Sequence, residues 1–516
     1  MLSKIRTAAL SGMSGMEVEV QTDISPGLPY FEITGMGDTA VREAAARVKR
    51  AVINSGFEYP KHKIAVNLAP AYIKKSGSHF DLGIAAGVLK ASGILKGDTD
   101  STLFIGELAF DGRLLPAKGI LPMIMPLSGP SCRNSIKEII LPAANCPEAY
   151  LFTAETDIDI IPAESLIHAA EHINGRKITP YKGCRHGGME FNGEFEDFGN
   201  IKGNLTGKEA VMAALAGGHN MLMIGPPGSG KTMLAKCGAG ILPPMSLKEK
   251  IETTSIYSYA GKLRDDMPYI DHRPFRRIGP GITRAALTGG GNNPMPGEIS
   301  LAHNGVLFID EMLQIPAAIL ETLREPLEEK KIAISRGHSR VVFPSDFVLI
   351  GAANPCPCGH LGDDSHQCTC TPGQITRYRA HLSGAIGDRI DICIEMTRVE
   401  YGNLKEKAGI SSDQMRQTVM RAREVQLEKR GMLNGQMKTA DVEKYCTLTT
   451  EGENTLKRIY ESERISVRRY FKLLKVARTI ADIKDSKQIR DCHLMAAYQY
   501  VRLLENKTWG NIYGQP

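Results

Sequence analysis

The sequence contains no long hydrophobic run, and this absence argues against a membrane-spanning helix. No apolar stretch approaches the ~20 residues that such a helix needs. The opening segment MLSKIRTAALSGMSGMEVEV holds one short apolar patch and then becomes strand-like, so we identify no signal peptide in it. We therefore expect a cytoplasmic protein with no membrane partner.

Paired cysteines are lacking everywhere except in one short segment. Four of the 11 cysteines lie between residues 354 and 370, and the others stand singly along the chain. An odd total and scattered positions argue against a disulfide framework. A strong charge of one sign is lacking as well, because the formal net charge is only +6 over 516 residues. This balance permits a nucleic-acid partner but does not by itself indicate one.

The composition is that of an ordinary globular protein, with 42% hydrophobic and 23% charged residues. A chain of 516 residues is too long for one core. Residues 1–171 alternate strand-like and helical runs, residues 172–198 are rich in glycine and charge, residues 199–400 contain fully apolar strands, and residues 401–516 are helical. These patterns predict an α/β N-terminal domain, a linker, an α/β core with a parallel sheet, and a C-terminal helical domain.

A glycine-rich phosphate-binding loop begins the core. It follows the apolar strand NMLMIG and precedes a helical run, which is the context that such a loop requires. Its backbone N–H groups and the helix N-terminus would bind the phosphates of ATP, Lys231 would neutralise their charge, and Thr232 would hold Mg²⁺. The residues of the loop are Gly225, Pro226, Pro227, Gly228, Ser229, Gly230, Lys231 and Thr232.

Two further apolar strands end in polar residues suited to ATP hydrolysis. GVLFIDE ends in adjacent acids, of which Asp310 would bind Mg²⁺ and Glu311 would polarise the attacking water. FVLIGAAN ends at Asn354, whose amide could orient that water. Arg389 lies in a tight turn before another strand and suits an arginine finger, although a surface arginine is an equal alternative at this point. Arg468 could reach the nucleotide from the C-terminal helices.

The cysteine-rich segment NPCPCGHLGDDSHQCTC has the spacing of a metal site. Two close pairs, in the pattern C-x-C-x9-C-x-C, can surround a tetrahedral Zn²⁺ and staple a polar hairpin that has no core of its own. His360 and His366 are possible substitute ligands, and four reduced thiols without metal are the alternative. The predicted structural zinc ligands are Cys356, Cys358, Cys368 and Cys370.

Together these strings resemble the magnesium-chelatase-like AAA+ ATPases of the YifB/ComM family. The resemblance rests on GPPGSGKTMLA, GVLFIDE, FVLIGAANPCPCGHLGD and LKVARTIADI, together with ISPGLPYFEITGMGDTA near the start, and it covers nearly the whole chain. It implies a hexameric ring with ATP bound between subunits, Arg389 acting from the neighbouring subunit, and Arg468 as the second sensor of a helical lid. It also implies branch migration of DNA, in natural transformation and recombination.

Two basic segments are candidates for contact with branched or single-stranded DNA. The first, HRPFRRIGPGITRAALTGGGNNPMPGEIS, corresponds in the family to an insertion that faces the pore of the ring, and the second, EEKKIAISRGHSRVVFP, has the pattern of a hairpin. Ordinary subunit-contact surface is the alternative for both segments. The candidate residues are Arg273, Arg276, Arg277, Arg284, Lys330, Lys331, Arg336 and Arg340.

The N-terminal domain resembles the Lon-protease fold, whose catalysis needs a serine and a lysine. The serine position falls on His79, with Ser76 and Ser78 close by, and the lysine position falls on Leu121, with Lys118 nearby. We therefore expect a domain without proteolytic activity. For the whole chain the favoured function is an ATP-hydrolysing DNA motor. The alternative is a protein-remodelling or metal-chelatase-type motor subunit that acts on an unidentified partner protein.

Overall fold

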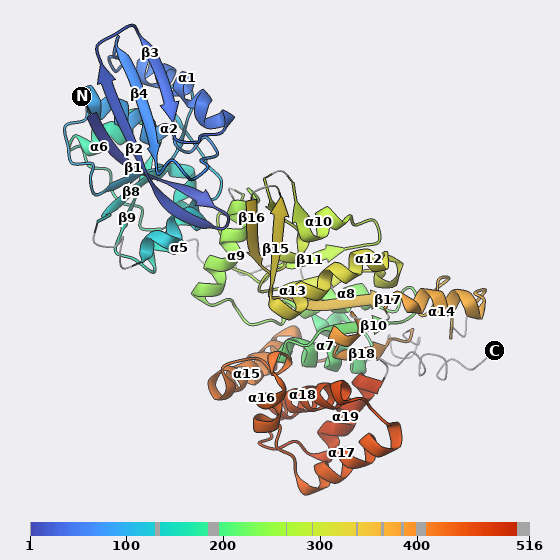
Figure 1. Ribbon diagram of the computed structural model, residues 1–516. Coiled ribbons are helices and arrows are strands. Elements are labelled where there is room, and N and C mark those ends of the chain that lie inside the picture. Colours follow the sequence, from blue (N-terminus) through green and yellow to red (C-terminus); the bar gives the residue numbers. More distant parts are fainter. Residues whose placement is uncertain are drawn as a thin grey trace.

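The computed structural model describes residues 2–129, 135–183, 196–264, 266–291, 293–336, 339–362, 366–382, 386–398 and 409–502. Figure 1 shows three parts in a row: the N-terminal domain in blue, a central α/β core in green and yellow, and a helical lid in orange and red. Within the described ranges, no helix has the length and apolar character needed to cross a membrane.

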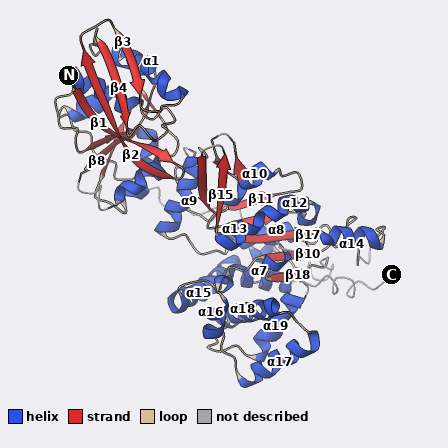
Figure 2. Cartoon of the chain, viewed as in Figure 1, coloured by secondary structure: helices blue, strands red, loops and turns tan. Residues whose placement is uncertain are grey.

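The N-terminal domain is built on a mixed seven-stranded sheet (Figure 2). Its order is β3-β4-β2-β1-β5-β8-β9, in which β2 runs antiparallel to β1 and β4 and the remaining pairs are parallel. The alternation of strands and helices predicted for this part of the sequence is confirmed. The strands are β1 (Leu2–Ser11), β2 (Ser14–Ser25), β3 (Tyr30–Thr34), β4 (Lys63–Ala69), β5 (Thr102–Phe104), β8 (Glu138–Pro142) and β9 (Asp159–Ala163), with the small hairpin β6 (Glu107–Leu108) and β7 (Leu114–Leu115) beside them.

Helices complete this domain, and α1 shows why they form. Asp38 caps its N-terminus by accepting a hydrogen bond from the backbone N–H of Val41. Its buried residues Val41, Ala44, Val48, Ala51 and Val52 recur at helical spacing and pack on the sheet. The helices are α1 (Thr39–Asn54), α2 (Asp81–Ala91), α3 (Ile120–Ile124), α5 (Cys146–Thr153) and α6 (Leu166–Ile173).

The core contains the predicted parallel sheet, in the order β11-β14-β17-β10-β18. Every residue of its three inner strands is buried, which confirms that both faces are covered. The strand β11 was not predicted, because its sequence FRRI is short and polar. The strands are β10 (Met221–Ile224), β11 (Phe275–Ile278), β14 (Val306–Ile309), β17 (Val348–Ala353) and β18 (Ile392–Glu395).

Helices and two hairpins surround the core sheet. The predicted hairpin is confirmed as β15 (Lys331–Arg336) paired with β16 (Ser339–Pro344), and a smaller one joins β12 (Gly289–Gly290) to β13 (Met295–Pro296). The helices are α7 (Leu205–Gly217), α8 (Lys231–Gly240), α9 (Leu247–Tyr259), α10 (Arg284–Thr288), α11 (Glu298–Leu301), α12 (Ala317–Leu320), α13 (Arg324–Glu329) and α14 (Pro372–Ala380).

The sequence predicted that the C-terminal domain is helical, without the bounds of its helices. Capping residues explain where several of these helices start. Ser411, Thr449 and Ser466 each accept a hydrogen bond from a backbone N–H of the first turn that follows. The lid shares one hydrophobic cluster with the core, so the two pack as a unit. Its helices are α15 (Ser412–Arg430), α16 (Thr439–Tyr445), α17 (Thr450–Glu463), α18 (Val467–Ile483) and α19 (Asp491–Arg502).

The helix α9 extends from the core and packs on the N-terminal domain, against α3 and α5. Ser258 Oγ donates to Glu148 Oε2 at 2.5 Å, and the Gly119 N–H donates to the Ser258 carbonyl at 3.1 Å. Burial raises the pKa of Glu148 to about 7, although hydrogen bonds from Ser258 and Asn145 oppose the shift. Polar as well as apolar contacts therefore hold the first domain to the core.

Candidate nucleotide site

The phosphate loop occupies the carboxyl end of β10 and leads directly into α8. Gly228 and Gly230 have φ of +79° and +86°, a conformation that L side chains rarely adopt. The loop is anchored by a hydrogen bond from the Gly225 N–H to the Ala353 carbonyl, 3.1 Å away at the end of the neighbouring strand β17. The backbone therefore has the turn that a phosphate-binding loop needs.

Lys231 lies inside this loop rather than in solvent. Its Nζ donates to the carbonyls of Gly225 at 2.7 Å and Pro226 at 2.9 Å, and it lies 3.4 Å from Oδ1 of Asn354. Burial lowers the pKa of Lys231 to about 8, and the Asp310 and Glu311 carboxylates, which would raise it, offset the effect only in part. The ammonium is therefore poorly compensated until an anion enters the loop.

We predict that ATP binding weakens above about pH 8, by up to tenfold per pH unit. Below the Lys231 pKa of about 8 the side chain is already charged, so the affinity should not change with pH. Above this pKa, Lys231 is neutral in the free protein, and ATP binding must be coupled to its protonation, because the phosphates stabilise the ammonium. Equilibrium titration with a fluorescent ATP analogue between about pH 7 and about pH 9.5 measures the effect. The Lys231→Arg variant, which keeps its charge, should show a flat profile, and a flat wild-type profile would contradict the prediction.

Asp310 ends β14 beside the phosphate loop. Thr232 Oγ1 lies 3.4 Å from Asp310 Oδ2, so the hydroxyl and carboxylate expected to hold Mg²⁺ are together. Arg277 Nη2 lies 2.6 Å from the same carboxylate oxygen. Arg277, which the sequence assigned to a DNA surface, therefore binds at the predicted Mg²⁺ carboxylate. Sequence reasoning missed this contact because β11 itself was missed.

Glu311 follows Asp310 with an unusual backbone. Its φ is +48°, in the left-handed region that non-glycine residues seldom occupy, and its N–H donates to Asp310 Oδ1 at 3.1 Å. Such strain persists only where the surroundings enforce it, and it concentrates at functional sites. The conformation turns the chain sharply after β14, directly after the carboxylate that faces the phosphate loop.

The four cysteines of the predicted zinc site come together. Their sulfurs all lie within 4.8 Å of one another, with Cys356–Cys358 at 3.4 Å and Cys368 at 3.6 Å from both. A tetrahedral zinc with Zn–S bonds of ~2.3 Å needs S···S separations of about 3.8 Å. Burial alone would raise the pKa of Cys358, but hydrogen bonds from the backbone N–H groups of His360 and Thr369 and from the Cys356 and Cys370 side chains together lower that pKa to about 6. The donor set therefore fits a structural zinc.

This cysteine loop packs directly on the phosphate loop. Gly359 has φ of +85°, and a Cβ at that position would lie 2.9 Å from Cδ of Pro227. Arg379 on α14 donates to the carbonyl of Pro355 and so fixes the start of the loop. His360 and His366 stack on each other with ring centroids 4.9 Å apart and are not among the clustered ligands. The cysteine loop is thus placed to support the phosphate loop at Pro227.

Arg389 and Arg468 lie together, at the edge of the sheet opposite the phosphate loop. Arg389 ends the turn η6 (Gly387–Arg389) that leads into β18, and Met221 at the start of β10 pairs with Ile392 at the start of β18. Because the strands are parallel, the phosphate loop follows their other ends. Arg389 contacts Glu328 on α13, and Arg468 contacts Asp388. Within one subunit the partner of Arg468 is therefore Asp388 in the turn that carries Arg389, and its role as a second sensor stays a prediction.

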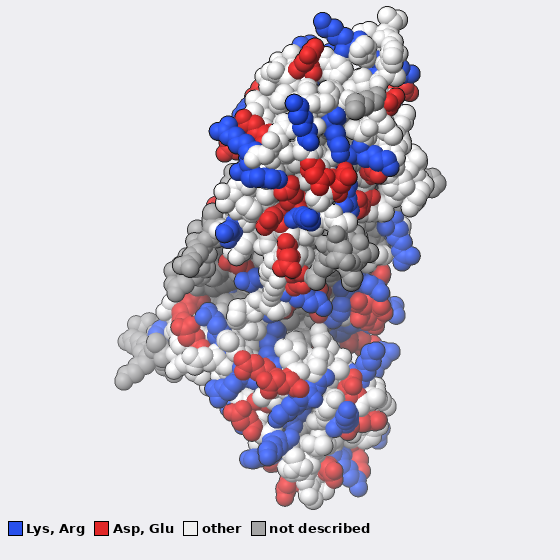
Figure 3. Space-filling model, turned by 90° about the vertical axis from the view of Figure 1, so that its left-hand side faces the viewer, with Lys and Arg blue, Asp and Glu red and all other residues white. Residues whose placement is uncertain are grey.

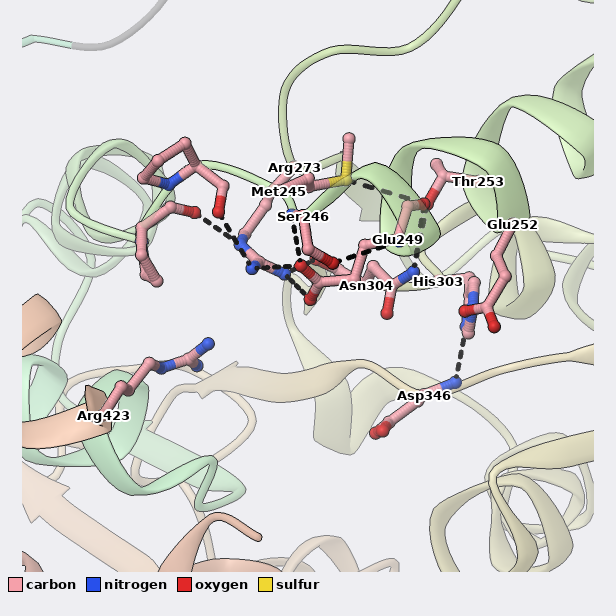
Figure 4. Close-up of polar contacts among 12 residues, drawn as sticks. Met245, Ser246, Glu249, Glu252, Thr253, Arg273, His303, Asn304, Asp346 and Arg423 are labelled. Atoms are coloured by element: carbon pink, nitrogen blue, oxygen red, sulfur yellow. Dashed lines mark hydrogen bonds and ion pairs between the residues drawn. The ribbon is translucent and has the colours of Figure 1, made fainter. Parts of the chain in front are cut away.

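The sequence-based assignment of Arg273 to a DNA-contacting surface is corrected by the structure. Its side chain is 9% exposed, and it donates to Glu249 at 2.8 Å, to the Pro243 carbonyl at 2.6 Å and to the Asn304 carbonyl at 2.8 Å. Figure 4 shows the Arg273 guanidinium beside Glu249 and Asn304. A side chain so enclosed has a structural role and does not present its charge to a DNA phosphate. The cause is the ion pair with α9, which sequence spacing could not indicate.

The other candidate DNA residues differ in their exposure. Arg276 is held by Glu298 at 2.6 Å, Lys330 by Asp346 at 3.1 Å, and Lys331 lies 3.8 Å from Glu329. Arg284 and Arg340 are exposed, and the side chain of Arg336 lies outside the described part of the structure. The face in Figure 3 carries Lys and Arg interspersed with Asp and Glu, so it offers no extended positive surface.

The N-terminal domain does not assemble a serine–lysine pair from the positions considered in the sequence. Ser78 contacts Glu107, and His79 is buried, which lowers its pKa to about 4. Lys118 is exposed beside Gly261 of the core, and Leu121 is buried in the domain. The absence of proteolytic activity in this domain stays a prediction.

Comparisons with known proteins cover almost the whole chain. Three family models match: "Subunit ChlI of Mg-chelatase" over residues 20–145, "Magnesium chelatase, subunit ChlI" over residues 197–404, and "Magnesium chelatase, subunit ChlI C-terminal" over residues 409–501. The competence protein ComM of Haemophilus influenzae is 37% identical over 515 residues, covering 98% of this chain and 99% of the relative. The YifB protein of Escherichia coli is 37% identical over 507 residues, covering 97% of each. The YifB protein of Salmonella typhimurium is 36% identical over 502 residues, covering 97% of each.

Proposed function

Because this chain belongs to the magnesium-chelatase-like YifB/ComM family of AAA+ ATPases, we propose that it is an ATP-hydrolysing motor that forms a hexameric ring and remodels DNA. The observation that carries the proposal is the separation of Arg389 from the phosphate loop at opposite edges of one sheet. An arginine placed there cannot serve its own ATP, and it suits a neighbour's site in a closed ring.

Each residue of the site then has a defined task. The N–H groups of the phosphate loop and the Lys231 ammonium bind the phosphates. Thr232 and Asp310 would hold Mg²⁺, which when bound neutralises charge on the phosphate oxygens. Glu311 accepts a proton from the attacking water, and Asn354, in contact with Lys231, orients that water. Arg389 and Arg468, from the adjacent subunit, stabilise the negative charge that develops during phosphoryl transfer.

Binding of Mg²⁺–ATP would change the contact between Arg277 and Asp310. Arg277 now pairs with Asp310 Oδ2, the oxygen that also faces Thr232. A carboxylate that takes a metal ion has less need of this guanidinium, whose side chain is 59% exposed and can turn to solvent or to a phosphate oxygen. Three further predicted cations are exposed and are our candidates for DNA contact: Arg284 on α10, Lys331 on β15 and Arg340 on β16.

Steady-state ATP hydrolysis, measured alone and with single-stranded, duplex and four-way-junction DNA, tests the proposed function. Strong stimulation by branched or single-stranded DNA supports the DNA motor. Turnover that is indifferent to every DNA contradicts it and favours the second candidate, a motor subunit that drives a partner protein. That alternative is supported by the match of all three domains to magnesium chelatase subunits.

A structural zinc is part of the proposal, and we predict about one zinc per chain in the purified protein. Replacing Cys368 with Ser should release the metal and lower the melting temperature by about 4–8 °C, the shift for ~2 kcal/mol in a core of this size. It should also weaken ATP binding, because Gly359 packs on Pro227 of the phosphate loop. Metal analysis and calorimetry measure both effects. The exposed, solitary Cys492 provides the control Cys492→Ser, and a zinc-free wild type would refute the site.

A further inference from the structure

The turn that carries Arg389 is held by side chains from two other elements of the chain. Asn220, which immediately precedes β10, donates from Nδ2 to the Arg389 carbonyl at 2.9 Å. Its Oδ1 accepts the Leu349 N–H of β17 at 3.0 Å, and its own carbonyl accepts the N–H groups of Asp391 at 2.9 Å and Ile392 at 3.1 Å. The Asn220 side chain therefore joins the backbone of the Arg389 turn to β17, and the Asn220 carbonyl joins the start of β18.

The second element is the lid helix α18. Lys472 donates from Nζ to the Ile390 carbonyl at 2.6 Å and lies 3.4 Å from the Gly387 carbonyl. These two carbonyls flank Arg389 on either side. One turn earlier on the same helix face, Arg468 contacts Asp388 in the same short turn. A partly buried ammonium that spans the carbonyls of a turn fixes its backbone, because it is costly to leave its hydrogen bonds unmade.

A third contact further along the same helix completes this attachment. Thr479 Oγ1 lies 2.8 Å from Nε2 of the fully buried His219, and the other ring nitrogen of His219 lies 3.4 Å from Asp391 Oδ2. Thus α18 contacts the Arg389 turn directly through Arg468 and Lys472, and it reaches Asp391 through His219. The helix also packs against α7, which leads into β10. The lid and the finger turn should therefore move together.

We propose that Lys472, together with Asn220, is a positioning residue that fixes the Arg389 turn and joins it to the lid, so that Arg389 and Arg468 reach the neighbouring nucleotide as one rigid unit. This inference rests on the proposed ATPase function with Arg389 acting in trans. Lys472 lies at the far edge of the sheet from its own phosphate loop. Its effect should therefore appear in the neighbour's turnover and not in its own nucleotide binding.

The variant Lys472→Met keeps the length of the side chain and removes the donor. In the full-length protein, kcat for ATP should fall at least tenfold, while KM stays within about twofold, because a positioned arginine finger acts mainly in the transition state. Lys472→Arg, which can still donate to both carbonyls, should restore much of the loss. Lys457→Met is the control, since Lys457 is exposed on the lid helix α17 and pairs only weakly, at 3.9 Å, with Glu461 of the same helix. It should retain wild-type turnover.

Mixing subunits separates positioning from general damage to the fold. Lys231→Ala subunits bind no ATP but offer an intact finger, and Lys472→Met subunits have an intact phosphate loop. In an equal mixture about one interface in four joins the two intact halves, so turnover should return to about a quarter of the wild-type rate. Asn220→Asp, which loses the donor to Arg389 but keeps the acceptor for Leu349, should behave in the same way.

The outcomes distinguish this inference from the function on which it rests. Normal turnover by Lys472→Met overturns the inference. So does a loss that mixing fails to restore while an Arg389→Ala mixture is restored, because the loss then comes from the mutant subunit's own site or fold. A wild type without ATP turnover, or an Arg389→Ala variant of normal activity, overturns the proposed function instead.

Discussion

The Glu311→Gln variant should bind ATP as tightly as the wild-type protein and hydrolyse it at least 100-fold more slowly. The substitution keeps the size of the side chain and the backbone, which has φ of +48° at this position, but the amide cannot accept the proton of the attacking water. Lys231, Thr232 and Asp310 are unchanged, so the contacts to the phosphates and Mg²⁺ remain. Loss of one negative charge near the phosphates should if anything tighten binding.

Equilibrium binding of a fluorescent ATP analogue measures the affinity of the variant, and steady-state phosphate release measures its rate of hydrolysis. The adjacent acid provides a contrast, because Asp310→Asn should weaken Mg²⁺-dependent binding itself: its carboxylate faces Thr232 and pairs with Arg277. Glu424→Gln on the exposed surface of α15 should change neither quantity. Ordinary turnover in Glu311→Gln would remove the assigned role of Glu311.

The phosphate site was predictable from sequence because its signals are local. Apolar strands that end in GPPGSGKT, in Asp310 and Glu311, and in Asn354 must place those groups at one edge of a parallel sheet. The cysteines were predictable for the same reason, since short spacing within one loop forces their sulfurs together. In both cases a site residue lies next in the sequence to a strand or loop that can be recognised, and that element decides where the residue is placed.

The contacts that sequence reasoning missed are made between distant segments. Arg273 seemed free in a glycine-rich, basic stretch, yet Glu249 on α9 encloses it, and α9 has no periodic signal that shows which face it presents. Arg277 pairs with Asp310 only because β11 joins the sheet beside β14. Arg468 is held by a carboxylate 80 residues away. Such pairs depend on the packing of the core and lid, which no spacing within one segment encodes.

The Arg389→Ala variant should lose about a thousandfold in kcat, the scale of an arginine finger, while its affinity for ATP changes little. The reason is topological: Arg389 precedes β18, and the subunit's own phosphate loop follows the other end of the adjacent strand β10. Arg389→Lys should recover only part of the rate, because an ammonium keeps the charge but cannot fork onto two oxygens. The exposed Arg421 on α15 offers the control Arg421→Ala.

A finger that acts in trans also makes turnover depend on assembly. Specific activity of the wild-type protein should rise with protein concentration until rings are complete, whereas Arg389→Ala should stay inactive at every concentration, although it still assembles. Size-exclusion chromatography with light scattering, run beside the hydrolysis assay, separates the two effects. An Arg389→Ala protein that is slow only because it fails to assemble would assign Arg389 to the subunit interface. In that case its contact with Glu328 on α13 would be the interaction to examine, since it sets the conformation that the side chain holds within one subunit.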